Sequence, residues 1–219
     1  MTGLQIIDSA LRVIGVLRSG DTAANDSAVQ ADCLLALNLM LKNFQNYGLE
    51  LWTRKKAAHT LTAATASYNI TSFTSDIPER ILQAYLTESG SDTEVEIVSM
   101  YEYWKLTNKT ASGNPNQIAY DFNNTSGTLY VWPLPADSTH SLSIVYHKPY
   151  NDFDSATDAP DVPQRWFEAL KWQLAIRLAP EFGRTTTQEM LLLASTTLDN
   201  ALDAGYEESG VVFQPKFRY

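Results

Sequence analysis

The chain has 219 residues, which is enough for one large domain or two small ones, and 44% of them are apolar, which is sufficient for a sizeable core. The net charge of −9 argues against a nucleic-acid-binding protein of the basic kind, although DNA can still slide past such a surface without sticking. Cys33 is the only cysteine, so no intramolecular disulfide forms. The sequence opens without a basic and apolar leader and has no apolar run approaching about 18 residues, so we expect an intracellular, soluble protein without a membrane span.

Two helices are predicted at the start of the chain. Thr2 suits the N-cap of a helix that runs to about residue 17, because apolar residues recur after it at three- and four-residue spacing. Asn25 or Asp26 is the expected cap of a second helix over about 26–47, which Gly48 ends. A short link between two helices favours an antiparallel hairpin. The core stripe of the second helix comprises Val29, Cys33, Leu37, Met40, Phe44 and Tyr47, widened by Leu34 and Leu41.

Short segments rich in β-branched and aromatic residues follow, up to about residue 150. Their spacing is typical of a small antiparallel sandwich or barrel, with one short helix over 100–106. A five-residue polar turn after residue 122 predicts a hairpin between its two flanking strands. The predicted strands are 58–61, 67–70, 80–87, 94–98, 117–122, 128–132 and 141–147.

Helical spacing returns after an acidic segment at 151–162, which we interpret as a solvated linker. Pro163 is typical of a first helical position, and Pro180 with Gly183 marks the end of that helix. The helix is apolar on two sides, which predicts a central helix packed by neighbours on both flanks. A last helix is predicted over about 186–204, and its packing side comprises Met190, Leu193, Ala194, Thr197, Leu198 and Ala201.

These elements predict an α+β fold. Residues 1–52 and 151–205 form an antiparallel helical bundle built from both chain ends, and 53–150 form an inserted antiparallel β-sandwich or barrel-like module. Residues 206–219 form an extended C-terminal tail. An apolar tail that cannot fold alone is expected to dock on another surface, such as a neighbouring subunit, in preference to its own domain. Its candidate anchors are Val211, Val212, Phe213, Phe217 and Tyr219.

Residues with catalytic or metal-binding chemistry are sparse. His59, His140 and His147 lack the spacing of metal ligands, and we expect all three on strand surfaces. Cys33 lies on the apolar stripe of its helix and is expected in the core. The basic run Arg54, Lys55 and Lys56 is a candidate contact for phosphate or an acidic partner, although three such residues at a domain border are usually just a solvated edge. We predict no catalytic residue, no metal site and no cofactor, and therefore no enzyme.

Several phrases together resemble the head-to-tail adaptor proteins of tailed bacteriophages, the connectors or tail accessory factors of short-tailed phages. The first helix and the stretch 31–49 are similar to the start of these proteins. The stretch 101–115 is similar to their short helix leading into a Gly-x-Pro turn, and 127–135 resembles the strand that follows. The stretch 169–183, with its Leu-Ala-Pro-Glu-aromatic-Gly ending, resembles their C-terminal helix. The resemblance runs from about residue 4 to 205 and leaves out the tail.

The resemblance implies a structural protein of the virion without enzymatic activity. Made in the host cytoplasm, it would assemble at the portal vertex as a ring, usually of twelve copies. The ring would extend the DNA channel, help to retain packaged DNA and dock the tail nozzle or tube. Its partners would be further copies, the portal protein, the tail protein and DNA that passes without sequence-specific binding. We expect the helical module to line the ring and meet the portal, with the tail as a clasp.

Two other functions fit the same residues. A tail-tube or tail-completion protein is the nearest alternative within the phage hypothesis. A carbohydrate- or receptor-binding module is favoured by the aromatic residues of the β region. These are Tyr101, Tyr103, Trp104, Tyr120, Tyr130 and Trp132.

Overall fold

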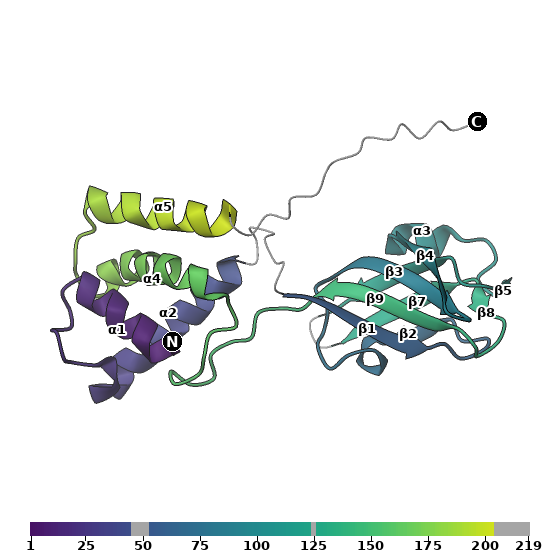
Figure 1. The fold of residues 1–219 in the computed structure, drawn as a ribbon, viewed down its shortest axis with the longest axis horizontal. Coiled ribbons are helices and arrows are strands. Elements are labelled where there is room, and N and C mark those ends of the chain that lie inside the picture. Colours follow the sequence, from purple (N-terminus) through teal and green to yellow (C-terminus); the bar gives the residue numbers. More distant parts are fainter. Residues whose placement is uncertain (45–52, 124–125, 204–219) are drawn as a thin grey trace. The chain divides into compact units, whose positions relative to one another are not determined.

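The computed structural model describes residues 1–44, 53–123 and 126–203, and the chain separates into two compact units (Figure 1). One unit is Met1–Trp52 together with Asn151–Tyr219, and the other is Thr53–Tyr150. The described residues contain five α-helices and a seven-stranded sheet, so the prediction of an α+β protein is confirmed.

Four of the α-helices belong to the first unit, and the first two begin at predicted caps. The Thr2 hydroxyl accepts a hydrogen bond from the Gln5 backbone N–H, while the Gln5 side chain accepts one from the N–H of Thr2. Asp26, and not Asn25, caps the second helix, because its carboxylate accepts from the N–H groups of Ala28 and Val29. Residues 45–48, with the predicted Tyr47 and Gly48, lie outside the described residues. The helices are α1 Gly3–Val13, α2 Ser27–Phe44, α4 Phe167–Glu181 and α5 Gln188–Asp203, with 3-10 turns η1 Ala23–Asn25 and η5 Gln164–Trp166.

Helices from both ends of the chain share one hydrophobic core. α4 packs against α1, α2 and α5 (Figure 1), and the Trp166 ring just before α4 lies 5.8 Å from the Phe44 ring, centroid to centroid. Cys33 is fully buried in this core, as predicted. α4 itself buries Ala169, Leu170, Leu174, Ala175, Leu178 and Ala179.

The packing side of α5 is narrower than predicted. Ala194, Leu198 and Ala201 are buried, but Leu193, which was predicted on the same side of the helix, is 44% exposed. Consecutive helical residues point about 100° apart. Leu193 therefore projects sideways when Ala194 faces α4.

The acidic segment 151–162 is not the solvated linker that we predicted. The amides of Gly3 and Leu4 donate to the carbonyls of Asp158 at 2.9 Å and Ala156 at 2.6 Å, and Phe153 and Ala156 are buried. The first amides of a helix have no partner within it, so nearby carbonyls satisfy them. Gly3 permits this approach, since a Cβ there would lie 3.0 Å from the Phe153 ring.

The second unit contains the sheet and the helix α3, Met100–Lys105. The predicted hairpin is present, with Gln117 opposite Trp132 and Phe122 opposite Gly127. The short strands β5, Ser112–Gly113, and β8, Leu134–Pro135, form a separate pair that the sequence analysis missed. The strands of the main sheet are β1 Arg54–Thr60, β2 Ser67–Asn69, β3 Arg80–Glu88, β4 Ser91–Val98, β6 Gln117–Phe122, β7 Gly127–Trp132 and β9 Ser141–His147.

The sheet is mixed, whereas the prediction was a purely antiparallel sandwich or barrel-like module. Its order is β1-β9-β3-β4-β6-β7-β2, and it curls into a half-barrel. β4 and β6 run parallel, whereas the other neighbours are antiparallel. Parallel neighbours need a crossover connection. Here the segment between β4 and β6, which contains α3, is the crossover connection. The antiparallel prediction did not consider that the short helix allows such a connection.

We predict that the Asn38 side chain holds the 151–162 segment against α2. Its amide donates to the Phe153 carbonyl at 3.1 Å, and its carbonyl accepts from the Phe153 N–H at 2.9 Å. Asn38→Ala is expected to lower the free energy of unfolding by about 1–3 kcal/mol, because two backbone groups lose their partner. Denaturant unfolding measures this loss. Asn200→Ala, on the exposed side of α5, is the matched control. Equal stability of the two variants would contradict the prediction.

Candidate functional site

The predicted basic run forms the start of an edge strand. Arg54, Lys55 and Lys56 open β1, which pairs with β9 and lies at the end of the sheet order. Lys55 Nζ lies 3.0 Å from the Asp76 carboxylate, and Lys56 Nζ lies 4.7 Å from the centroid of the Tyr85 ring. A hydrogen bond with Tyr85 raises the pKa of the exposed Lys56. The run is thus a charged edge whose lysines contact their own unit, a composition that discourages pairing of sheet edges.

The aromatic residues of the β unit do not form one group. Tyr103, Trp104 and Tyr130 pack together, with ring centroids 5.0–5.9 Å apart. Trp104 is 58% exposed and Tyr101 69% exposed, and Lys109 and Lys105 lie over their respective rings.

The remaining aromatics have structural contacts of their own. The Tyr120 hydroxyl donates to the Pro78 carbonyl, and burial raises the pKa of Tyr120 to about 12. Trp132 donates to the Asn108 carbonyl. Only Tyr101 and Trp104, both on α3, therefore present large exposed aromatic surfaces among the six candidates.

The prediction of surface histidines is wrong for His140 and His147, which are buried. His147 Nδ1 lies 2.9 Å from the Thr53 hydroxyl. The His59 ring, partly exposed on β1, packs against the rings of Tyr68 and Phe73. The three histidines have separate surroundings, and within residues 1–44, 53–123 and 126–203 no group of histidine, cysteine and carboxylate side chains could hold a metal ion.

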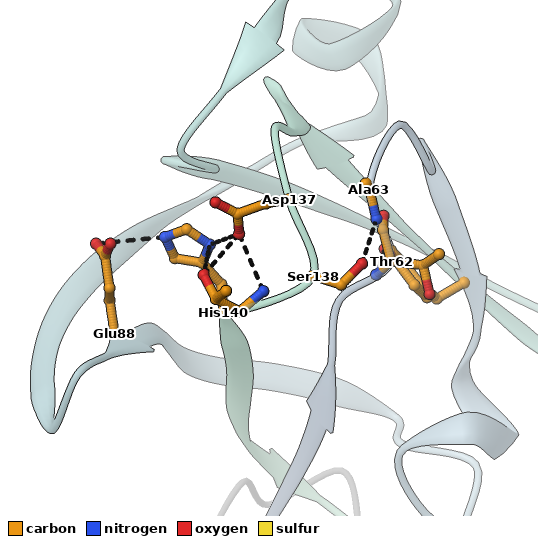
Figure 2. A network of polar contacts seen from close by, with 8 residues as sticks. Thr62, Ala63, Glu88, Asp137, Ser138 and His140 are labelled. Carbon is orange, nitrogen blue, oxygen red and sulfur yellow. Dashed lines mark hydrogen bonds and ion pairs between the residues drawn. The ribbon is translucent and has the colours of Figure 1, made fainter.

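Figure 2 shows the contacts that surround His140. Nδ1 lies 3.0 Å from the Asp137 carboxylate, and Nε2 lies 3.3 Å from the Glu88 carboxylate. The second contact is within ion-pair range but lacks hydrogen-bond geometry, so it attracts only when the ring is protonated. The segment just before β9 makes a further contact, in which the Ala63 N–H donates to the Ser138 hydroxyl at 3.0 Å. These contacts join three connections of the sheet.

A comparison with family models decides the family. The model of the SU10 adaptor protein family matches residues 1–211. The chain belongs to the SU10 adaptor family. This is a family of phage head-to-tail adaptor proteins, so the suspected resemblance is confirmed and the protein is a structural phage adaptor. No curated protein matched the sequence.

The extent of the match corrects one boundary. The SU10 adaptor match continues to residue 211, past the limit of about 205 that the sequence phrases indicated. It therefore includes the start of the tail and the anchor Val211. The other predicted anchors, Val212, Phe213, Phe217 and Tyr219, follow the match, and all five lie outside the described residues.

For an adaptor, the relevant chemistry is that of surfaces. None of the described helices is long and apolar enough to cross a membrane. The sequence analysis missed the exposed leucines of α2 and α5, because it assigned each helix a single packing side. The signal was present in α2, where Leu35 and Leu39 lie four residues apart outside the predicted stripe and are 60% and 56% exposed.

We predict that Asp137 stabilises the β unit in a pH-dependent way. Hydrogen bonds from Thr139, and then from His140, lower the pKa of Asp137 below its ordinary value of 3.8. A lowered folded-state pKa contributes stability that is complete above the unfolded-state value and is lost as the pH falls through the folded-state pKa. Asp137→Ala should therefore lower the free energy of unfolding at about pH 7. The variant should also lose less of this free energy than the wild type between about pH 7 and pH 3.

Chemical unfolding at both pH values tests this expectation. Glu94→Ala is the control, because Glu94 is an exposed carboxylate on β4. An Asp137 variant that loses as much stability between the two pH values as the wild type would contradict the assignment.

Proposed function

We propose that this adaptor assembles as a ring, of twelve copies, beneath the portal of a tailed phage. The ring extends the DNA channel, helps to retain packaged DNA and docks the tail nozzle or tube. The observation that carries the proposal is the family match over residues 1–211, since it spans both units and nearly the whole chain. The protein would be made in the host cytoplasm and act at the portal vertex of the virion.

The charge of the chain supports a role as a DNA conduit. Its net charge is −9 and its sequence pI is about 4.7. Carboxylates that line a channel repel the phosphates of DNA and keep it from adhering to the wall. DNA would therefore pass through the ring without sequence-specific contacts.

We assign different partners to the parts of the chain. The helical unit, 1–52 with 151–205, lines the ring and meets the portal protein. The tail, 206–219, reaches a neighbouring copy or the portal as a clasp, with its aromatic residues as anchors, since aromatic side chains dominate contact energies at interfaces. Arg54, Lys55 and Lys56 offer a basic edge to an acidic partner.

One observation favours a second candidate function. Tyr101 and Trp104 present exposed rings on α3, and exposed aromatic faces can stack on a sugar or on a partner protein. Binding of soluble glycans to the isolated protein, lost in Trp104→Ala, would favour the receptor-binding function. A tail-tube protein would form rings or tubes without a portal.

We predict that the adaptor forms its ring on portal-bearing heads. Purified protein alone should elute at a smaller size than a ring, and mixing with portal-bearing heads should give a ring that is visible by electron microscopy. Stable tubes of the isolated protein would instead indicate the tail-tube alternative. Failure to bind any portal would overturn the adaptor ring.

The tail is tested within the same assay. Phe213→Ala with Phe217→Ala should weaken assembly on heads by about tenfold or more, because each loses a large apolar contact. Gln214→Ala with Lys216→Ala is the matched control in the same segment. Unchanged assembly after deletion of 206–219 would exclude the clasp.

A further inference from the structure

The side of α2 that faces away from the core carries a line of apolar residues, with the exposed Asp32 beside it. Leu35 is 60% exposed and Leu39 is 56% exposed. Ala28 and Ala31 are exposed in line with them, at three- and four-residue spacing on the same helical face. We call these four residues the α2 outer stripe. Single exposed leucines are ordinary on protein surfaces, but a helix that is apolar on two opposite sides is normally covered on both.

α5 has an uncovered apolar surface of its own. Leu191, Leu192 and Leu193 are 47%, 67% and 44% exposed, and they surround the first turns of the helix on the half that does not face α4. We call these three residues the α5 leucine collar. Towards the other end of the helix the exposed side chains include Asp199 and Asp203. The sequence of α5 contains no lysine or arginine.

The two surfaces cannot cover each other within one copy. α2 and α5 both pack on α4, and they lie on different sides of it (Figure 1). The outer stripe and the collar are therefore different faces of one helical unit. A contact between two different faces of identical copies is heterologous, and it closes into a ring when the rotation between copies permits.

We propose that the α5 leucine collar of one copy packs on the α2 outer stripe of the next copy, and that this contact joins the ring. The inference rests on the proposed function, because it names the surfaces through which the ring closes. Ala28 and Ala31 leave space beside the α2 backbone, into which leucine side chains of the collar fit.

Charge sets the direction of the two helices. Lys42 follows the α2 outer stripe on the same face of the helix. Its side chain is 47% exposed and forms an ion pair with Asp152 at 3.0 Å. A lysine ammonium has three donors, so it can also serve a second carboxylate. The spacing from Ala31 to Lys42 equals that from Leu192 to Asp203, eleven residues or about 16 Å of helix. A parallel arrangement therefore places the collar on the alanines and Asp203 beside Lys42, away from the exposed Asp32.

Cysteine cross-linking tests the contact, and the native thiol leaves a low background. Cys33 is fully buried, and burial raises its pKa to about 11, so it is a poor nucleophile towards maleimides. The variant Ala31→Cys/Leu192→Cys, assembled on portal-bearing heads and treated with a short bismaleimide, should give a ladder of covalent multimers. A mixture of the two single variants should give dimers.

Each control has a defined result. Ala31→Cys alone and Leu192→Cys alone should give no covalent dimer, because the contact joins different faces. A cross-linked dimer of either single variant would mean that a face pairs with itself, and it would overturn the proposal. Ala31→Cys/Phe122→Cys, with the second thiol on the β unit, should give no ladder. Ala31→Cys cross-linking with Phe213→Cys, but not with Leu192→Cys, would make the tail the occupant of the stripe and would also overturn it.

Assembly of surface variants gives a second readout. Leu35→Gln and Leu192→Gln change exposed side chains, so folding is expected to be retained, and each should reduce ring occupancy on heads by about tenfold, equivalent to about 1.4 kcal/mol. Phe122→Gln, 49% exposed on β6, is the matched control and should assemble normally. A wild-type ring with no ladder and with unaffected glutamine variants would overturn this inference alone, whereas wild-type protein that forms no ring would overturn the proposed function as well.

Discussion

The helical unit depends on one packing constraint, the insertion of α4 between helices from the other end of the chain. α4 packs on the apolar sides of both α1 and α2, and the Trp166 ring just before it packs against Phe44. Burial of these side chains is the main favourable term for a unit of this size. Since α4 follows the whole β unit in sequence, the two chain ends must meet before the helical core exists.

The 151–162 segment also joins the two ends of the chain, through its contacts with α1. Its carbonyls accept from the first amides of α1, and its Phe153 ring packs over Gly3. A segment with four aspartates is thereby attached to the helical unit by its backbone and one apolar ring, while acidic side chains such as Asp152 remain at the surface. The return of the chain from the β unit is thus part of the helical core.

The polar contacts of the β unit hold its own fold together, whereas the exposed leucines of α2 and α5 suit the joining of copies. The polar contacts around His140 connect strands and turns, and the lysines of β1 contact residues of their own unit. By contrast, α2 and α5 present leucines that no described element covers. For a structural adaptor of phage, uncovered apolar helix faces are a natural means to join copies, because apolar area removed from water supplies the driving force of association.

Local pattern in the sequence determined where the helices and the seven strands of the main sheet lie, the cap at Thr2 and the place of Cys33 in the core, because caps and periodicity act over a few residues. It narrowed the second cap to Asn25 or Asp26, and the structure decided for Asp26. Short phrases in order also indicated the family that the family model then showed. Only the tertiary structure decided that β4 and β6 are parallel neighbours, that His140 and His147 are buried, that 151–162 docks on α1 and that Leu35 and Leu192 are left exposed. Each of these depends on which distant segments become neighbours, and residue spacing along the chain does not encode that choice.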